Sequence, residues 1–246
     1  MKTMNFSKFL TLAFAATTLF LTSCAKDPEV VVPVVKEYAK VMLFHGATDA
    51  GAVNLQINGV TKNLDSLKYG SATAYNQAEL TAGKKTAVVV LGAKSGAKIA
   101  TDSLLMNKDI GYSYFIYQEN DAPKTVTVFK SVDDLALPVA GKGRLRLVHL
   151  IPDLQVGVDV ELVAPGALAT TNSQFKNVKF KDISNFLDVA AGTYDVKVKL
   201  TGTTQLLLSV PISITVADGK LYTVVARGYA NAVAPRGGTL TVINNN

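Results

Sequence analysis

The chain contains two histidines, His45 and His149, and each is followed four residues later by an aspartate, Asp49 or Asp153. A carboxylate beside an imidazole can orient the ring, and such a pair can contribute to a metal site. A zinc site needs further ligands, yet the chain offers no third histidine and only a single cysteine. We therefore interpret both pairs as structural and predict no metal and no cofactor, with metal binding as the alternative hypothesis.

Alternation along a strand predicts where the second histidine lies. Side chains two residues apart share a face, so His149 falls with Leu145 and Leu147 and opposite Arg146. We expect its ring at the edge of a core, and we expect Asp153 to cap the turn that follows.

The single cysteine, Cys24, has the most specific chemistry in the sequence. It ends the run Leu21-Thr22-Ser23-Cys24, which follows a basic start and an apolar stretch at 9–21. This order is typical of a lipoprotein signal peptide at 1–23, cleaved between Ser23 and Cys24, with lipid attached to the thiol. The stretch is shorter than the ~20 apolar residues of a transmembrane helix. One cysteine forms no internal disulfide, so hydrophobic cores must hold the fold.

Residues 24–39 are expected to form an extended, lipid-anchored tether, because Pro28 and Pro33 stand in a β-branched context. Lys26-Asp27 resembles the signal that sends some lipoproteins of Gram-negative bacteria to the outer face of the outer membrane; a solvated linker is the alternative interpretation. We predict a protein anchored in the bacterial outer membrane, on its periplasmic face or at the cell surface.

Other catalytic arrangements are not indicated. Gly111-Tyr112-Ser113-Tyr114 lacks the second glycine of a nucleophile elbow, and no helical segment follows it. Asp133 and Asp134 are neighbours on a strand and point to opposite faces, so they cannot flank one bond, and we expect both to be solvated. The glycines do not have the spacing of a phosphate-binding loop. The sequence therefore predicts no catalytic residues.

Aromatic residues suggest binding surfaces, each with a structural alternative. The segment at 175–181 interleaves Phe175 and Phe180 with lysines, which could contact nucleic acid or an anionic glycan. An amphipathic strand with snorkelling lysines is the interpretation we favour. Tyr112 and Tyr114 share one face of a strand and Tyr117 lies on the other, so at least one set is expected in a core.

Composition favours a β-rich protein. The chain has no tryptophan and many valines, threonines and glycines. Loss of Lys2 and Lys8 with the signal lowers the formal net charge from +6 to +4, which is too mild to argue for nucleic acid as a partner.

An internal repeat organises the rest of the chain. VMLFHGATD at 41–49 recurs as LRLVHLIPD at 145–153, and GYSYFI at 111–116 matches LYTVVA at 221–226 when the tyrosines are aligned. Repeats of this length are duplicated domains, since solenoid units repeat every ~20–50 residues. We predict a first domain at 40–134, a linker at 135–142 and a second domain at 143–246.

Each copy shows about seven strand-like runs separated by turn signals, the pattern of a β-sandwich. In the first copy the runs lie at 40–45, 53–58, 72–80, 85–92, 98–106, 111–118 and 124–130. In the second copy they lie at 143–150, 157–163, 176–189, 193–201, 205–216, 220–228 and 238–244.

Alternation in one strand of the second copy predicts a solvent-exposed face that bears Lys197 and Lys199. When the two copies are aligned, Val88 and Val90 occupy these positions in the first copy. An apolar outer face is usually covered. We expect this face of the first domain to pack against the second domain or a partner.

The two copies also resemble a known family. RLRLVH at 144–149 with Pro152-Asp153, VDV at 158–160, AGTYDV at 191–196 and LYTVVA at 221–226 resemble the domain of unknown function 4397 family (DUF4397). The resemblance implies exported β-sandwiches in tandem, with no agreed activity and no catalytic residues to carry over. A weaker similarity, limited to the Gly-Thr-Tyr turn, is to the carboxypeptidase regulatory-like sandwich.

Together these features predict an all-β protein of two tandem immunoglobulin-like or transthyretin-like β-sandwiches behind a lipid anchor. We interpret it as a non-enzymatic binding or scaffold module of the cell envelope, with an envelope protein or a glycan as partner and no nucleic acid. The alternatives are a carbohydrate-binding accessory of an outer-membrane uptake system and a metal-dependent hydrolase that uses His45 or His149.

Overall fold

The computed structural model describes residues 35–120, 125–154, 156–170, 172–208, 212–234 and 236–246. The predicted signal peptide, Cys24 and most of the predicted tether lie outside these residues. Lys36–Asn246 forms one compact unit. Within the described ranges every regular element is a strand, and no helix there is long and apolar enough to cross a membrane.

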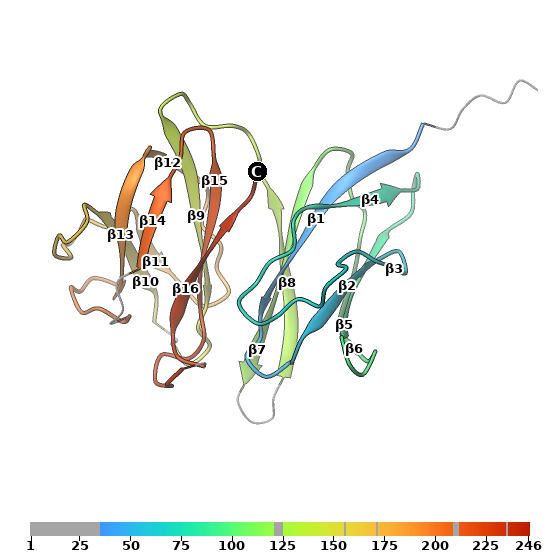
Figure 1. Ribbon diagram of the computed structural model, residues 1–246, viewed down its shortest axis with the longest axis horizontal. Coiled ribbons are helices and arrows are strands. Elements are labelled where there is room, and N and C mark those ends of the chain that lie inside the picture. The colour runs from blue at the N-terminus through green and yellow to red at the C-terminus, as the bar shows by residue number, and fades with distance from the viewer. Residues whose placement is uncertain (1–34, 121–124, 155, 171, 209–211, 235) are drawn as a thin grey trace, which may run out of the picture. The chain divides into compact units, whose positions relative to one another are not determined.

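The chain folds as two tandem β-domains (Figure 1), and the described residues form eight strands in each. The first comprises β1 (Glu37–Gly46), β2 (Val53–Ile57), β3 (Val60–Thr61), β4 (Asn76–Leu80), β5 (Thr86–Gly92), β6 (Lys98–Leu104), β7 (Gly111–Asn120) and β8 (Thr125–Asp133). The second comprises β9 (Lys142–Leu150), β10 (Val158–Val163), β11 (Phe175–Val178), β12 (Leu187–Ala190), β13 (Gly192–Leu200), β14 (Ile212–Val216), β15 (Leu221–Arg227) and β16 (Thr239–Asn244).

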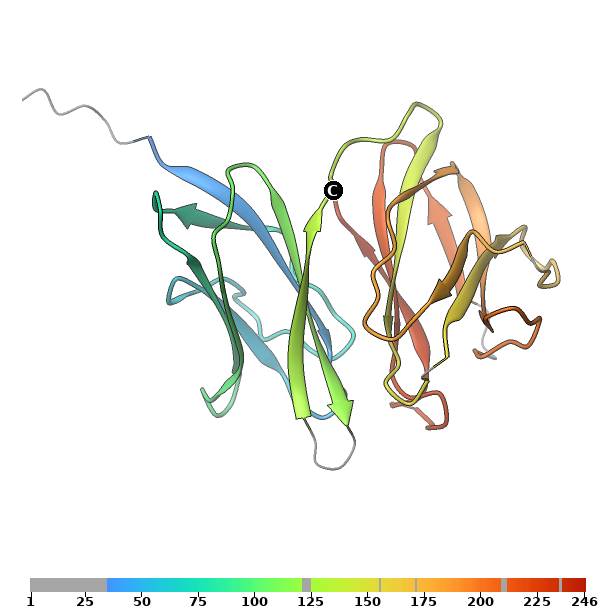
Figure 2. The ribbon, with the colours of Figure 1, turned by 180° about the vertical axis from the view of Figure 1, so that it is seen from behind.

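Both domains have the same topology, which confirms the duplication. The sheets of the first have the orders β4-β1-β7-β8 and β3-β2-β5-β6, and those of the second have the orders β12-β9-β15-β16 and β11-β10-β13-β14. The strand numbers differ by eight throughout. In each domain the two sheets stack as layers, which are seen from the opposite side in Figure 2. The pairs β1–β7 and β9–β15 are parallel, and the other pairs are antiparallel.

Strand register supports the alignment of the two copies. Val41 lies opposite Tyr112, and Leu145 lies opposite Tyr222. Each tyrosine hydroxyl accepts a hydrogen bond from a backbone amide five residues upstream, at 3.0 Å in the first copy and 3.2 Å in the second. Tyr112 and Tyr222 therefore occupy equivalent positions, and each holds the connection that precedes its own strand.

Several predicted boundaries differ from the observed strands, and two of them illustrate why. Residues 37–39, assigned to the tether, begin β1, where Ala39 is buried against Ala78 of β4. The predicted strand at 176–189 is two strands, since β11 pairs with β10 in one sheet and β12 pairs with β9 in the other. The chain changes sheets between them through a turn in which Lys181 has a φ of 71°. A period-two pattern does not reveal such a crossing, because each short strand keeps its own alternation.

Each domain has its own hydrophobic core between its sheets. The first core includes Leu43, Leu55 and Tyr114, and the second includes Leu147, Val160 and Val224. Tyr112 and Tyr114 lie in the first core as expected, whereas Tyr117 is buried in a third cluster.

The predicted apolar outer face of β5 is wrong. Val88 and Val90 are buried in the core of their own domain, opposite Ile57 and Leu55 of β2. Their equivalents in the second copy are Val196 and Val198, which face Leu162 and Val160 of β10. The sequence alignment was therefore shifted by one residue, which exchanges the two faces of a strand.

The predicted wet face of β13 is also wrong at Lys199. This side chain is fully buried, and its Nζ lies 2.9 Å from Glu161 Oε2. The lysine also donates to the carbonyl of Thr170. Thr170 belongs to the connection between β10 and β11, so this connection covers the outward face of the strand.

Candidate binding site between the two sandwiches

The residues predicted for lipid attachment and cleavage, Cys24 and Ser23, lie outside the described part of the chain. The predicted histidine sites lie inside it. Among the described residues, no group of three or more His, Cys, Asp and Glu side chains is placed to hold a metal ion.

His45 is completely buried and does not pair with Asp49. Its Nε2 lies 2.5 Å from the carbonyl of Gly51, so Nε2 carries the proton and donates it. Asp49 instead accepts a hydrogen bond from Gln118 at 3.1 Å and lies 3.4 Å from Arg236 of the second domain. Burial lowers the pKa of His45; the Gly51 carbonyl opposes this shift and the charge of Arg227 adds to it.

His149 is equally buried and does not pair with Asp153. Its Nδ1 accepts the Ile151 amide at 3.2 Å, so the proton lies on Nε2. Burial lowers the pKa of this histidine to about 4, against the opposing charge of Asp182. Asp153 accepts hydrogen bonds from the backbone amides of Ala230 and Asn231. It therefore caps the loop after β15 and not the turn that follows His149. The rings lie inside the protein and not at the edge of a core.

A third apolar cluster joins the two domains. It combines one face of β1 and β7 with one face of β9, β15 and β16. Its buried members are Met42, Phe44, Phe115, Tyr117, Val148, Leu150, Val225 and Ile243. Phe180 packs edge-on against Tyr117 at a centroid distance of 5.6 Å, so one aromatic of the predicted 175–181 segment serves this interface. Sheet faces that would be wet in an isolated sandwich are covered here.

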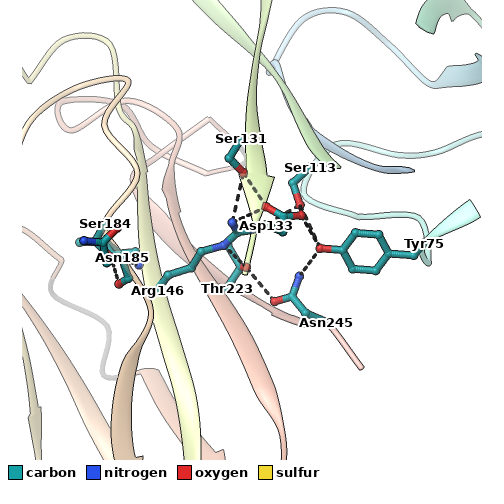
Figure 3. Close-up of polar contacts among 10 residues, drawn as sticks. Tyr75, Ser113, Ser131, Asp133, Arg146, Ser184, Asn185, Thr223 and Asn245 are labelled. Carbon is teal, nitrogen blue, oxygen red and sulfur yellow. Dashed lines mark hydrogen bonds and ion pairs between the residues drawn. The ribbon is translucent and has the colours of Figure 1, made fainter. Parts of the chain in front are cut away.

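Arg146 lies at the centre of the polar part of this interface (Figure 3). Its Nη1 lies 2.5 Å from Asp133 Oδ1 of the first domain, and the side chains are 3% and 0% exposed. Nη2 donates to Ser113 Oγ at 3.0 Å, and Nε donates to Thr223 Oγ1 at 2.9 Å. The guanidinium also stacks over Phe186, 4.7 Å from the ring centroid. A buried charge is tolerated because it is paired and hydrogen-bonded on several sides.

The carboxylate partner is equally well satisfied. Asp133 Oδ2 accepts hydrogen bonds from Ser113 Oγ and Tyr75 Oη, both at 2.6 Å. Burial, followed by the charge of Asp133, raises the pKa of Tyr75, so the phenol stays protonated as a donor. Asn245 closes the network, since it donates to Tyr75 at 3.4 Å and accepts from Thr223 at 2.7 Å.

Asp133 and Asp134 point to opposite sides, as expected, but only one of them is solvated. Asp134 is 64% exposed and lies 2.7 Å from Arg144, whereas Asp133 is buried. The expectation that both are solvated is therefore wrong for Asp133. Its strand face is covered by the second domain, and a pattern within one strand does not reveal that cover.

A cavity of about 520 Å³ opens where the 62–75 connection of the first domain meets the β13–β14 connection and the β15–β16 end of the second. Tyr69 lines it from one domain and Arg227 from the other, with the guanidinium carbon 4.3 Å from the tyrosine ring centroid. The edge of the Tyr69 ring also contacts His45, at a centroid distance of 6.2 Å. The remaining described lining is largely apolar or glycine: Leu207, Leu208, Ile212, Ala230, Ala232, Ala234, Gly237, Gly238 and Thr239.

Reasoning from the sequence did not single out Arg227 or Tyr69, and it named Arg146 only as lying opposite the core face. One signal was present. The central strands are nearly continuous apolar runs, as in Val41–Phe44 and Tyr222–Ala226, and such runs are typical of strands buried on both faces. An arginine inside one of these runs, as in LRLV, indicates a paired charge within an interface.

The DUF4397 model, described as a domain of unknown function, matches residues 39–161 and 156–245. The chain belongs to the DUF4397 family. The first match extends past the first sandwich to the end of β10, although the strand order places β9 and β10 in the second.

No curated protein matches this DUF4397 chain. Solved structures with distant likeness include the carbohydrate-binding module CBMbc (family CBM26) from Eubacterium rectale Amy13K in complex with maltoheptaose, at 12% identity and a TM-score of 0.27. This match covers 85% of the present chain and 97% of the other. A putative cell adhesion protein from Bacteroides eggerthii matches at 13% identity and a TM-score of 0.21, covering 86% and 97%. At these TM-scores the likeness carries no functional inference.

Proposed function

We propose that this DUF4397 protein is a non-enzymatic binding module of the bacterial cell envelope, anchored by lipid on Cys24 in the outer membrane. The observation that carries the binding role is the cavity lined jointly by Tyr69 and Arg227. Tyr69 of the first domain lines it together with residues of the second, and the buried ion pair of Arg146 and Asp133 joins the two domains. A mostly apolar cavity with a few polar groups is the usual form of a ligand site.

The described lining also supports a role in binding and not in catalysis. It contains an arginine, a tyrosine and a threonine, but no histidine, cysteine or carboxylate. A nucleophile and a general base within hydrogen-bond reach are the usual requirement for hydrolysis. The anchor is supported by the Leu21–Cys24 run after its apolar stretch.

The anchor is tested by growing cells with an alkyne-bearing fatty acid and separating their membranes. The native protein should carry the label and fractionate with the outer membrane, and Cys24→Ala should carry none. Lys94→Gln, at an exposed loop position of the first domain, is the matched control and should be labelled like the native chain. Label on Cys24→Ala, or native protein in the soluble fraction, would overturn the anchor.

The binding role is tested with a photo-crosslinking amino acid at Leu208 in intact cells, compared with the same group at Lys94. The proposal expects a crosslinked envelope component from position 208 that is lost when Arg227→Gln is added. Equal crosslinking from both positions would contradict a role for the cavity.

A further inference from the structure

The orientation of the Arg227 guanidinium at the cavity is fixed by its neighbours. Nε donates to Thr241 Oγ1 of β16 at 2.7 Å, and the plane of the group stacks on Tyr69. Gly70 makes this approach possible, because a Cβ there would stand 2.4 Å from Nη2. Its φ of +80° also favours glycine. The backbone of the first domain is therefore shaped to receive an arginine of the second.

The charge of Arg227 is not balanced by any described residue. Three other arginines each lie beside a carboxylate: Arg144 beside Asp134, Arg146 beside Asp133, and Arg236 beside Asp49. Arg227 takes part in no ion pair within the described ranges, and its Nη groups make no hydrogen bond there. A guanidinium that is held in place without a counter-charge is suited to an incoming anion.

Tyr69 provides a second unsatisfied group at the same place. Its hydroxyl is buried and has no hydrogen-bond partner in the described part of the chain. Leaving such a group unpaired costs about 1–3 kcal/mol, so its pairing with a ligand oxygen is favourable. Tyr69 and Arg227 both line the cavity, so each domain contributes a polar side chain to it.

The rest of the lining determines what accompanies the anion. Leu207, Leu208 and Ile212 form an apolar wall, and no lysine and no second unpaired arginine stands among the described lining residues. A dianionic phosphate would have only one of its two charges balanced by Arg227. A carboxylate has a single charge and a planar shape that allows bidentate pairing with one guanidinium. The apolar wall excludes highly hydrated ligands such as sugar acids from favourable contact.

We propose that this cavity binds a monocarboxylate with an apolar tail, with the carboxylate on Arg227 and Tyr69 and the tail against Leu207, Leu208 and Ile212. This inference rests on the proposed binding function and assigns its ligand class. It concerns the two-sandwich unit alone, since Lys36–Asn246 is compact and holds its own cores.

The test is isothermal titration of residues 36–246 with octanoate, 1-octanol and acetate. Octanoate should bind more tightly than octanol, which lacks the charge, and than acetate, which lacks the tail. Arg227→Gln should weaken octanoate binding about tenfold or more, as expected for loss of a charge-assisted hydrogen bond. Tyr69→Phe should weaken it severalfold, and Lys94→Gln should leave it unchanged.

Arg227→Lys controls for misfolding, because it keeps the positive charge but removes the planar guanidinium that can donate two parallel hydrogen bonds. This variant should have the melting temperature of the native protein and bind octanoate with intermediate affinity. The inference is overturned if native protein does not bind octanoate, if octanol binds as well as octanoate, or if Arg227→Gln binds octanoate like the native chain. The two proposals fail separately. If octanoate does not bind but position 208 still crosslinks in cells, only the ligand class is wrong. If octanoate binds but position 208 does not crosslink in cells, only the role in the envelope is wrong.

Discussion

At the scale of single residues, the buried histidines make the stability of the protein depend on pH. Burial holds the pKa of His149 at about 4, below its ordinary value of 6.5. Between these pH values the unfolded chain binds a proton at His149 that the folded chain does not bind. The contribution of the neutral His149 to the free energy of unfolding is therefore fully present above about pH 6.5 and is lost as the pH is lowered towards 4. His45 acts in the same direction, since burial lowers its pKa as well.

We therefore predict that the free energy of unfolding falls between pH 7 and pH 5, with His149 contributing roughly 2 kcal/mol of the loss. Urea titrations at the two pH values measure it. His149→Gln should lower stability at pH 7 but flatten its dependence on pH. An unchanged slope in this variant would show that His149 is not kept neutral by the fold.

At the scale of elements, strands β5 and β13 show what alternation can and cannot predict. The valines of β13 face the core as expected, whereas Val88 and Val90 of β5 also face the core and not the outside. Alternation fixes which residues share a face, but whether the opposite face meets water depends on segments far away in the sequence. Lys199 and Asp133 were assigned to water for this reason, and both are buried by distant segments.

The candidate site depends on distant contacts to an even greater degree. Tyr69 lies in an irregular connection and Arg227 ends a strand, so no local pattern joins them. Only the packing of two domains brings them within stacking distance. The histidine pairs, which local spacing did suggest, are separated because each aspartate finds partners on other elements.

The buried pair on the outer face of β13 gives a prediction at this scale. Lys199→Met leaves Glu161 buried without its cation, and removal of one partner of a buried pair costs about 3–5 kcal/mol. The double variant Lys199→Met with Glu161→Gln should recover much of this loss, because no unpaired charge remains. Chemical denaturation measures both.

Lys197→Met is the matched control on the same strand face. Its side chain is partly exposed, 3.8 Å from Asp195, and its loss should cost about 1 kcal/mol or less. Equal losses from Lys197→Met and Lys199→Met would contradict the burial of the second pair.

At the scale of the whole molecule, the two copies meet through equivalent faces. Met42 of β1 lies opposite Ser113, and Arg146 of β9 lies opposite Thr223, so Met42 and Arg146 correspond. By the same register Asp133 corresponds to Asn245, since Val132 pairs with Tyr112 and Asn244 pairs with Tyr222. At each of these two positions, therefore, one copy carries an uncharged side chain and the other a charged one: Met42 corresponds to Arg146, and Asn245 corresponds to Asp133.

This correspondence predicts how the interface responds to substitution. Arg146→Met leaves Asp133 buried without its cation and should destabilise the protein by about 3–5 kcal/mol. Adding Asp133→Asn should restore most of that loss, because the pair then has the Met and Asn side chains that Met42 and Asn245 already present at the equivalent positions. Since the cavity at Arg227 needs both domains in place, the single variant should also weaken octanoate binding and the double variant should retain it.

Arg144→Met provides the comparison, because Arg144 lies two residues away and its partner Asp134 is largely exposed, so its loss should cost about 1 kcal/mol or less. Urea unfolding measures stability, and octanoate titration measures the coupling. If Arg146→Met and Arg144→Met prove equally mild, the buried pair does not hold the domains together. If the double variant is as unstable as Arg146→Met, the loss comes from the missing hydrogen bonds of the arginine and not from the unpaired charge of Asp133.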